Sequence, residues 1–166
     1  MLENFEPKDV FYWFEELSKI PRCSRQEKKV SDFLVDFAKK RNFEVYQDHE
    51  NNVIIKKPAT PGYESKPTII MQGHMDMVCE KNNDTIHDFD NDPIRTIIDG
   101  DWVRADGTTL GADNGIGVAA EMAVLTDDTL EHGPIECLFT VDEETGLTGA
   151  MNLAPGFVKG TILLNL

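Results

Sequence analysis

The 166-residue sequence lacks any long run of apolar residues. About 18 consecutive apolar residues are needed to cross a bilayer, and no stretch approaches that length. The first seven residues are polar and acidic, unlike the apolar segment of a secretion signal. Internal repeats and heptad patterns are absent too. We therefore expect a protein that does not span a membrane and is not obviously exported, with a length that suits one domain.

Positive charge is also scarce. Sixteen Lys and Arg residues stand against 30 Asp and Glu residues, so the formal net charge is −14. This charge repels phosphate backbones and anionic lipid surfaces, and we expect no nucleic acid or membrane partner. An excess of carboxylates suits cation binding, although a solvated acidic surface is its commoner cause.

The sequence has only three cysteines, and their spacing does not suggest disulfide pairs. Cys23, Cys79 and Cys137 contain no CxxC pair and no framework of a small disulfide-rich domain, so a reducing cytoplasm is the expected location. Cys137, in mid-strand, is expected to pack in the core, and Cys79 to be a loop thiol rather than a nucleophile or ligand. His87 and His132 lie in predicted loops and are expected at the surface.

The spacing of apolar residues predicts two helices before any strand. The first covers residues 7–20, and the second follows residues 24–27, whose sequence has the pattern of a capping box. Strands are predicted at residues 43–47, 53–55, 68–72, 94–98, 102–104, 135–141 and 161–166, with a further helix from about residue 116. Helices interleaved with apolar strands predict an α/β domain with a mainly parallel central sheet flanked by helices.

Polar residues follow the strand at residues 68–72. Side chains two residues apart leave a strand on the same side, so His74 and Asp76 would point in one direction. Asp113 lies just before a predicted helix, and Glu143 and Glu144 follow the strand at residues 135–141. Each has an ordinary explanation on its own, as a polar loop residue, a helix cap or an acid in a first helical turn.

Ligands in such sheets gather beyond the carboxyl ends of the strands, so one edge could bring these five side chains together. Imidazole and carboxylate are the ligands that zinc takes at catalytic sites, and manganese and cobalt accept the same set. Two adjacent carboxylates repel each other unless a cation is present. If one glutamate binds a metal, the other is free to take a proton from a metal-bound water, which is the chemistry of metal-assisted hydrolysis.

Three segments, residues 72–78, 109–117 and 139–150, resemble the co-catalytic zinc peptidases, a family that includes aminoacylases, tripeptidase T and glutamate carboxypeptidases. Among its members the aminoacyl-histidine dipeptidases, also called peptidase D or carnosinase-like enzymes, are the most similar. The resemblance implies that His74 binds one metal, Asp113 bridges two, and Glu144 binds the other. It also implies that Glu143 is the general base and that Asp76 orients His74.

The resemblance implies two divalent cations, most often Zn²⁺, with Co²⁺ or Mn²⁺ as alternatives, and a substrate with an aminoacyl group, such as beta-alanyl, on histidine. Residues 1–166 would be the N-terminal portion of one catalytic domain, because the family has a further acidic ligand, a lid and dimerisation domain and a last histidine ligand beyond this point. By itself the chain is then expected to bind metal weakly and to have little activity. A tripeptidase, an N-acyl-amino-acid deacylase and a non-catalytic binding or scaffold relative are the alternatives.

Overall fold

The computed structural model describes residue 2 and residues 4–166. Its helices and strands follow the predicted order, with two helices before the first strand. They are α1 (Lys8–Ser18), α2 (Lys28–Lys40), β1 (Glu44–Gln47), β2 (Val53–Lys57), β3 (Ile69–His74), β4 (Thr96–Asp99), β5 (Trp102–Ala105), α3 (Ala112–Thr126), β6 (Ile135–Thr140), α4 (Glu143–Gly146), α5 (Thr148–Met151) and β7 (Ile162–Asn165).

Five strands form the central sheet in the order β1-β2-β6-β3-β7. The strands β6, β3 and β7 run parallel, whereas β2 is antiparallel to both of its neighbours, so four strands share one direction. The predicted α/β class and mainly parallel sheet are therefore confirmed. The register pairs His74 with Thr140, which brings the carboxyl ends of β3 and β6 to the same edge of the sheet.

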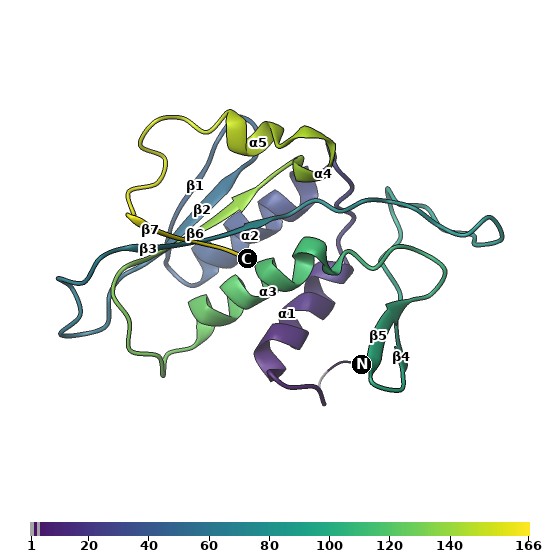
Figure 1. Ribbon diagram of the computed structural model, residues 1–166, viewed down its shortest axis with the longest axis horizontal. Coiled ribbons are helices and arrows are strands. Elements are labelled where there is room, and N and C mark those ends of the chain that lie inside the picture. The colour runs from purple at the N-terminus through teal and green to yellow at the C-terminus, as the bar shows by residue number, and fades with distance from the viewer. Residues whose placement is uncertain (1, 3) are drawn as a thin grey trace.

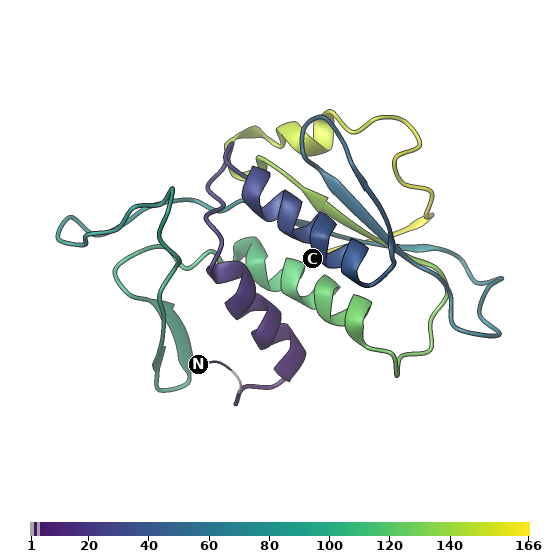
Figure 2. The same ribbon diagram turned by 180° about the vertical axis from the view of Figure 1, so that it is seen from behind.

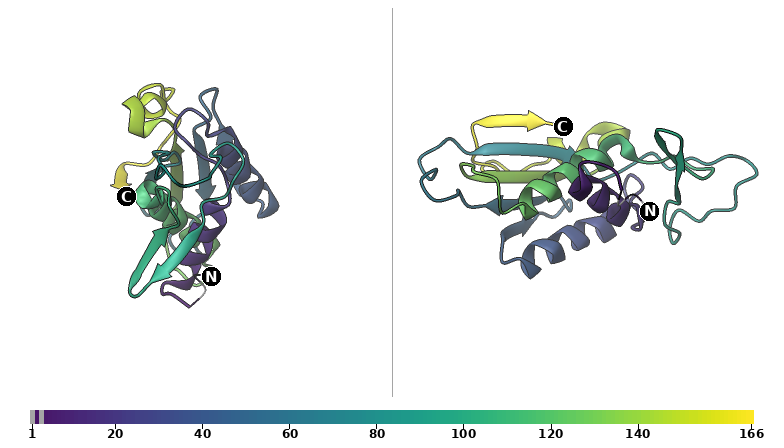
Figure 3. Two further views of the ribbon diagram at one scale, coloured as in Figure 1. Left: turned by 90° about the vertical axis from the view of Figure 1, so that its right-hand side faces the viewer. Right: turned by 90° about the horizontal axis from the view of Figure 1, so that it is seen from below.

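The three long helices cover one face of the sheet. Figures 2 and 3 show α1, α2 and α3 on the same side of the strands. Phe14, Leu34 and Met122 come from these helices and are buried with Ile55 and Phe139 of the sheet in the main core. A smaller apolar cluster lies on the other face, where the chain after α5 covers the sheet. Burial of this kind contributes about 25 cal/mol per Å² of apolar surface.

The hairpin of β4 and β5 is a separate two-stranded sheet that lies away from the central one (Figure 1). It forms around Asp99 and Gly100, the turn that the sequence predicts, and Gly100 has a positive φ of 60°. Strand β7 is an edge strand of the central sheet, and all four of its residues are exposed. In the part of the chain that the structure describes, no helix is long and apolar enough to cross a membrane.

The prediction of a capping box before α2 is wrong. The helix begins at Lys28, and the side chain of its N-terminal flanking residue, Glu27, makes no capping hydrogen bond. The Ser24 hydroxyl donates instead to Asp76, 52 residues away, at 2.8 Å. Ser24 and Glu27 have the residue types and spacing of a capping box, but tertiary partners compete for the same oxygen atoms.

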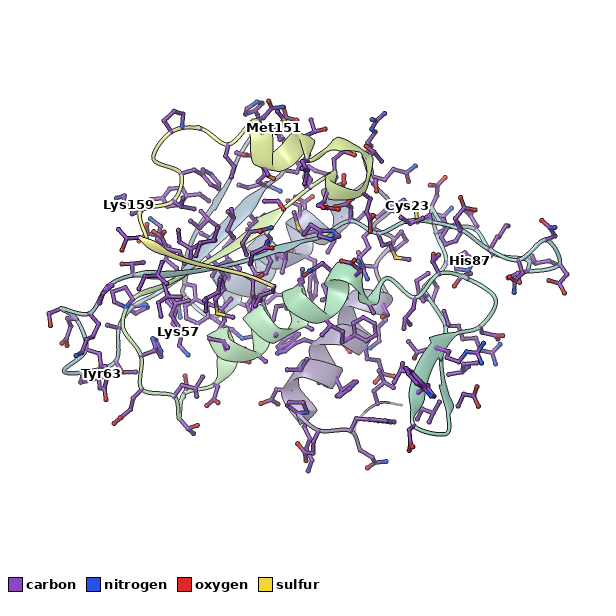
Figure 4. The ribbon with its side chains drawn as sticks, viewed as in Figure 1. Cys23, Lys57, Tyr63, His87, Met151 and Lys159 are labelled. Carbon is purple, nitrogen blue, oxygen red and sulfur yellow. A yellow bond between two sulfur atoms is a disulfide. The ribbon has the colours of Figure 1, made fainter. Side chains whose placement is uncertain are left out.

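The prediction that Cys79 is a loop thiol is also wrong. Cys79 forms a disulfide with Cys23, with a Cα–Cα distance of 5.6 Å and 56 residues between them in sequence. Figure 4 shows Cys23 where the connection between α1 and α2 meets the segment that leaves β3. Cys137 is a buried free thiol, as predicted. His87 and His132, predicted at the surface, are both half-buried.

The disulfide is expected to stabilise the fold. Replacing Cys79 with Ser should lower the free energy of unfolding by about 4 kcal/mol, because a loop across 56 residues is no longer closed in the unfolded chain. Urea unfolding of the oxidised protein measures this difference, and it should disappear when both proteins are reduced. Alkylation of all three cysteines in denatured, unreduced protein would contradict the pairing.

Candidate metal centre

His74 is the last residue of β3, and its imidazole is buried at the edge of the sheet. Alternation places the neighbouring Met75 in the hydrophobic core, so His74 and Asp76 both face the site, as the sequence predicts. The Nδ1 atom of His74 lies 3.3 Å from a carboxylate oxygen of Asp76 and 3.2 Å from its carbonyl oxygen. The Nε2 atom points the other way, to the carboxylate of Asp113 at 3.1 Å.

Asp113 reaches the site from the start of α3, next to β3 (Figure 1). The backbone at Asp113 and Asn114 is not helical, so the regular helix begins only after them. The Asp113 side chain is 84% exposed, and its polar contact is with the imidazole of His74. Asp113 therefore lies just before the regular helix, as predicted, but it is directed at His74 rather than at the helix N-terminus.

Glu143 and Glu144 form the first turn of α4, directly after β6. Successive side chains diverge by about 100° on a helix, so the two carboxylates separate. Oxygen atoms of Glu144 and Asp113 and a nitrogen of His74 all lie within 4.8 Å of one another. The Glu143 carboxylate is beside this group, 3.8 Å from His74 Nε2. All five predicted residues thus come together at one edge of the sheet.

Asp76 connects β3 to α4. One carboxylate oxygen accepts the backbone N–H of Glu143 at 3.0 Å, and the other accepts that of Glu144 at 3.2 Å. The Ser24 hydroxyl donates to the same carboxylate. Asp76 has no exposed surface, so these donors replace water around its charge. The positions of both glutamates relative to His74 therefore depend on Asp76.

The electrostatics of this contact favour an ionised Asp76. Burial opposes ionisation, but hydrogen bonds from His74, the Glu143 and Glu144 amides and the Ser24 hydroxyl together bring the pKa of Asp76 down to about 2. For His74, burial disfavours the imidazolium, yet the carboxylates of Asp76, Asp113 and Glu143 outweigh it and raise the pKa. A proton and a cation therefore compete for Nε2.

The donor set fits a divalent cation. One imidazole nitrogen and two carboxylates within 4.8 Å are ligands that zinc, cobalt and manganese accept. The pKa of Glu144 is raised by partial burial and by the charges of Asp113, Glu143 and Asp76, with His74 opposing. Crowded carboxylates of this kind repel each other, and a cation among them removes that repulsion.

The cluster opens into a cavity of about 340 Å³ at the carboxyl ends of the strands. Gln72 and Thr140 form part of its floor and are joined by a hydrogen bond of 3.1 Å between their side chains. Leu147 and Leu166 form apolar parts of the cavity wall, and Glu143 also lines the cavity. The cavity therefore offers room for a small ligand beside the proposed base.

Arg22 organises the site and is not among the residues predicted from sequence. Its buried guanidinium donates to the carbonyl oxygen of Met75 at 3.1 Å and to that of Gly111 at 2.6 Å. Burial lowers its pKa to about 10, which leaves it charged at neutral pH. A Cβ atom at Gly111 would lie 2.6 Å from this guanidinium, and one at Gly115 would lie 2.7 Å from it. The glycines of this turn are therefore the one sequence signal for the buried arginine.

Glu27, which the sequence predicts to be part of a capping box, instead supports the turn before α4. Its carboxylate accepts the backbone N–H groups of Arg25 and Asp142, both at 2.9 Å. Asp142 has a positive φ of 53° at the turn between β6 and α4, and its own carboxylate accepts the hydroxyls of Thr145 and Thr148. This connection fixes the turn that presents the two glutamates.

Asp76→Asn is expected to remove a pH-dependent part of the stability. The folded-state pKa of about 2 is below the ordinary 3.8, so ionised Asp76 stabilises the fold above about pH 4. That contribution, on the order of 2 kcal/mol, is lost as the pH falls from about 4 toward 2. The difference in unfolding free energy between the two proteins, measured in urea at several pH values, should shrink over that range.

Ser24→Ala is the control for Asp76→Asn. It removes one hydroxyl donor, so it should cost about 1 kcal/mol and keep most of the pH dependence. A difference between wild type and Asp76→Asn that stays constant from pH 6 to pH 2 would contradict the role of the carboxylate charge.

Comparisons with known proteins identify the family of the chain. Residues 70–163 match Peptidase family M20/M25/M40. The cytosol non-specific dipeptidase of Escherichia coli (strain K12) is 45% identical over 164 residues, which cover 99% of this chain and 34% of that protein. The chain thus spans about a third of the length of this relative.

Two solved structures are similar to the whole chain. The aminoacylhistidine dipeptidase of Vibrio alginolyticus has a TM-score of 0.97 at 49% identity, covering 99% of this chain and 34% of its own. The aminopeptidase PepT of Bacillus cereus ATCC 10987 has a TM-score of 0.79 at 26% identity, covering 96% and 43%. Since the family match includes more than half of the residues, the chain belongs to Peptidase family M20/M25/M40.

Proposed function

We propose that this chain supplies part of the active site of a dinuclear metallopeptidase that hydrolyses dipeptides, in particular those with an aminoacyl group on histidine. The observation that carries the proposal is the cluster of His74, Asp113 and Glu144, with donor atoms within 4.8 Å of one another. The names of two relatives, a non-specific dipeptidase and an aminoacylhistidine dipeptidase, support the substrate class.

In this proposal His74 binds one cation, Asp113 bridges two, and Glu144 binds the other. Zn²⁺ is the first choice, with Co²⁺ or Mn²⁺ as alternatives. Residues 1–166 are the N-terminal portion of one catalytic domain, and the remaining ligands and a lid or dimerisation domain lie outside this chain. Relatives about three times as long support that division.

The cations, when bound, polarise the scissile carbonyl and make water more acidic. Glu143 takes a proton from the attacking water and returns it to the leaving amine, which its position beside His74 Nε2 supports. Asp76 acts through His74, because it accepts the Nδ1 proton and so leaves Nε2 free for a cation.

The substrate is a small peptide, and a homodimer would form through a domain outside this chain. We also propose a cytoplasmic location, as in the cytosol dipeptidase that the chain resembles. The bond between Cys23 and Cys79 weighs against that location, because disulfides are rare in a reducing cytosol.

Glu143→Gln should lower turnover by about 10²- to 10⁴-fold and leave metal binding intact, because the amide cannot accept the proton. The assay is hydrolysis of beta-alanyl-histidine by the longest natural protein that carries this chain, with metal content measured in parallel. Tripeptides and N-acyl amino acids in the same assay separate the alternative activities. Retained turnover in Glu143→Gln would remove this residue from the role of base.

His74→Ala should weaken Co²⁺ binding by more than about 100-fold, because it removes the one nitrogen donor of the cluster. Cobalt is the probe because its visible absorption reports ligand geometry. His49→Ala is the matched control, since that imidazole is 77% exposed and outside the cluster. Equal Co²⁺ affinity in the His74 and His49 variants would contradict the metal site.

A further inference from the structure

Glu121 is a buried acid that the proposed mechanism does not use. It lies on α3 and is completely inaccessible to solvent. Neither of its carboxylate oxygens makes a hydrogen bond of good geometry with the described residues, although the Cys137 thiol lies close enough to interact with it. Two other buried glutamates differ in this respect. Glu27 accepts two backbone N–H groups, and Glu136 accepts those of Lys159 and Gly160.

Asn114 offers a second unpartnered atom in the same place. Its side-chain nitrogen donates to the carbonyl oxygen of Leu166 at 2.7 Å, which fixes the orientation of the amide. The amide oxygen is consequently turned inward, and it is buried without a partner in the described part of the chain. A buried amide oxygen left this way destabilises the fold.

The two groups meet beside Gly73 of β3. A Cβ atom at Gly73 would lie 2.7 Å from the Asn114 oxygen and 2.9 Å from an oxygen of Glu121. Asn114 immediately precedes the regular part of α3, and Glu121 lies within it. The missing side chain of Gly73 leaves a space that both oxygen atoms border.

Two acceptors can form a hydrogen bond only if one of them carries a proton. We propose that Glu121 is a neutral carboxylic acid that donates its proton to the side-chain oxygen of Asn114. This single bond satisfies both orphaned groups and avoids an unpaired charge in the interior.

The surroundings agree with a neutral acid. Burial raises the pKa of Glu121 well above its ordinary value, and the nearby Cys137 thiol offsets this only in part. Burial, followed by the charge of Glu121, raises the pKa of Cys137 as well, so the thiol supplies no ionised partner. Burial therefore favours the uncharged form of both side chains.

The bond has a consequence for the metal centre. Asn114 follows Asp113 directly, and Asp113 itself is 84% exposed, with His74 as its polar contact in the site. Asn114 is thus the anchor of this segment, held by Leu166 on one side and by Glu121 on the other. Glu121 is therefore a positioning residue for Asp113, a step that rests on the proposed metal-binding role of Asp113.

The test begins with the protonation state. Infrared spectroscopy of protein labelled with ¹³C-glutamate should show the C=O band of a protonated carboxyl group at pH 8, where exposed glutamates are ionised. The band should be absent in Glu121→Gln and present in Glu136→Gln, a control with a second buried glutamate. Absence of the band in the wild-type protein overturns the proposal and requires no variant to fold.

Co²⁺ titration then tests the positioning role, in this chain and in any longer natural protein that contains it. Glu121→Gln keeps a donor for Asn114 and should bind Co²⁺ within about threefold of wild type. Glu121→Met keeps the volume without the donor and leaves the Asn114 oxygen unpaired, so it should bind Co²⁺ about 10- to 100-fold more weakly under conditions in which urea unfolding shows that the variant is folded. Wild-type affinity in Glu121→Met overturns the positioning role. Failure of wild type to bind Co²⁺ rejects the proposed function, and the infrared band still tests the hydrogen bond.

Discussion

The carboxylate of Asp76 is the constraint on which the candidate site depends. It has no exposed surface, and its two oxygens accept the backbone N–H groups of Glu143 and Glu144 and the hydroxyl of Ser24 while facing His74. A buried charge is tolerated only when donors replace the lost water. Ser24 and the two glutamates come from two other segments of the chain, so satisfying one charge brings three segments together.

Arg22 extends the same network to the glycine-rich turn before α3. Its guanidinium is bound to the carbonyl oxygens of Met75 and Gly111, and thereby connects the chain around Asp76 to the chain before Asp113. The disulfide between Cys23 and Cys79 closes a loop over the same region. Metal centres need this kind of outer support, because a site binds its metal more weakly when no neighbouring residue holds the ligand side chains in position.

The side of the site that faces solvent carries the exposed carboxylates. Asp113 and Glu144 are exposed, whereas His74 and Asp76 are buried. The exposed carboxylates repel each other at this edge, which destabilises the fold slightly. A bound cation would remove this repulsion, and the relief would contribute to its binding free energy. The anchor on the buried side of Asp113 is Asn114, which connects the site to the interior of α3.

Sequence by itself determined the order of helices and strands, the α/β class and the five polar side chains at the strand ends. Apolar periodicity and the polarity of strand ends are local, so they can be recognised without knowing the fold. Only the tertiary structure decided that Ser24 bonds to Asp76 instead of capping a helix, that Cys23 pairs with Cys79, that Arg22 binds the backbone at Gly111, and that Glu121 is buried beside Gly73. The Ser24, Cys23 and Arg22 contacts join residues more than 50 positions apart, and no local pattern specifies which distant group will compete for a hydroxyl, a thiol or a guanidinium.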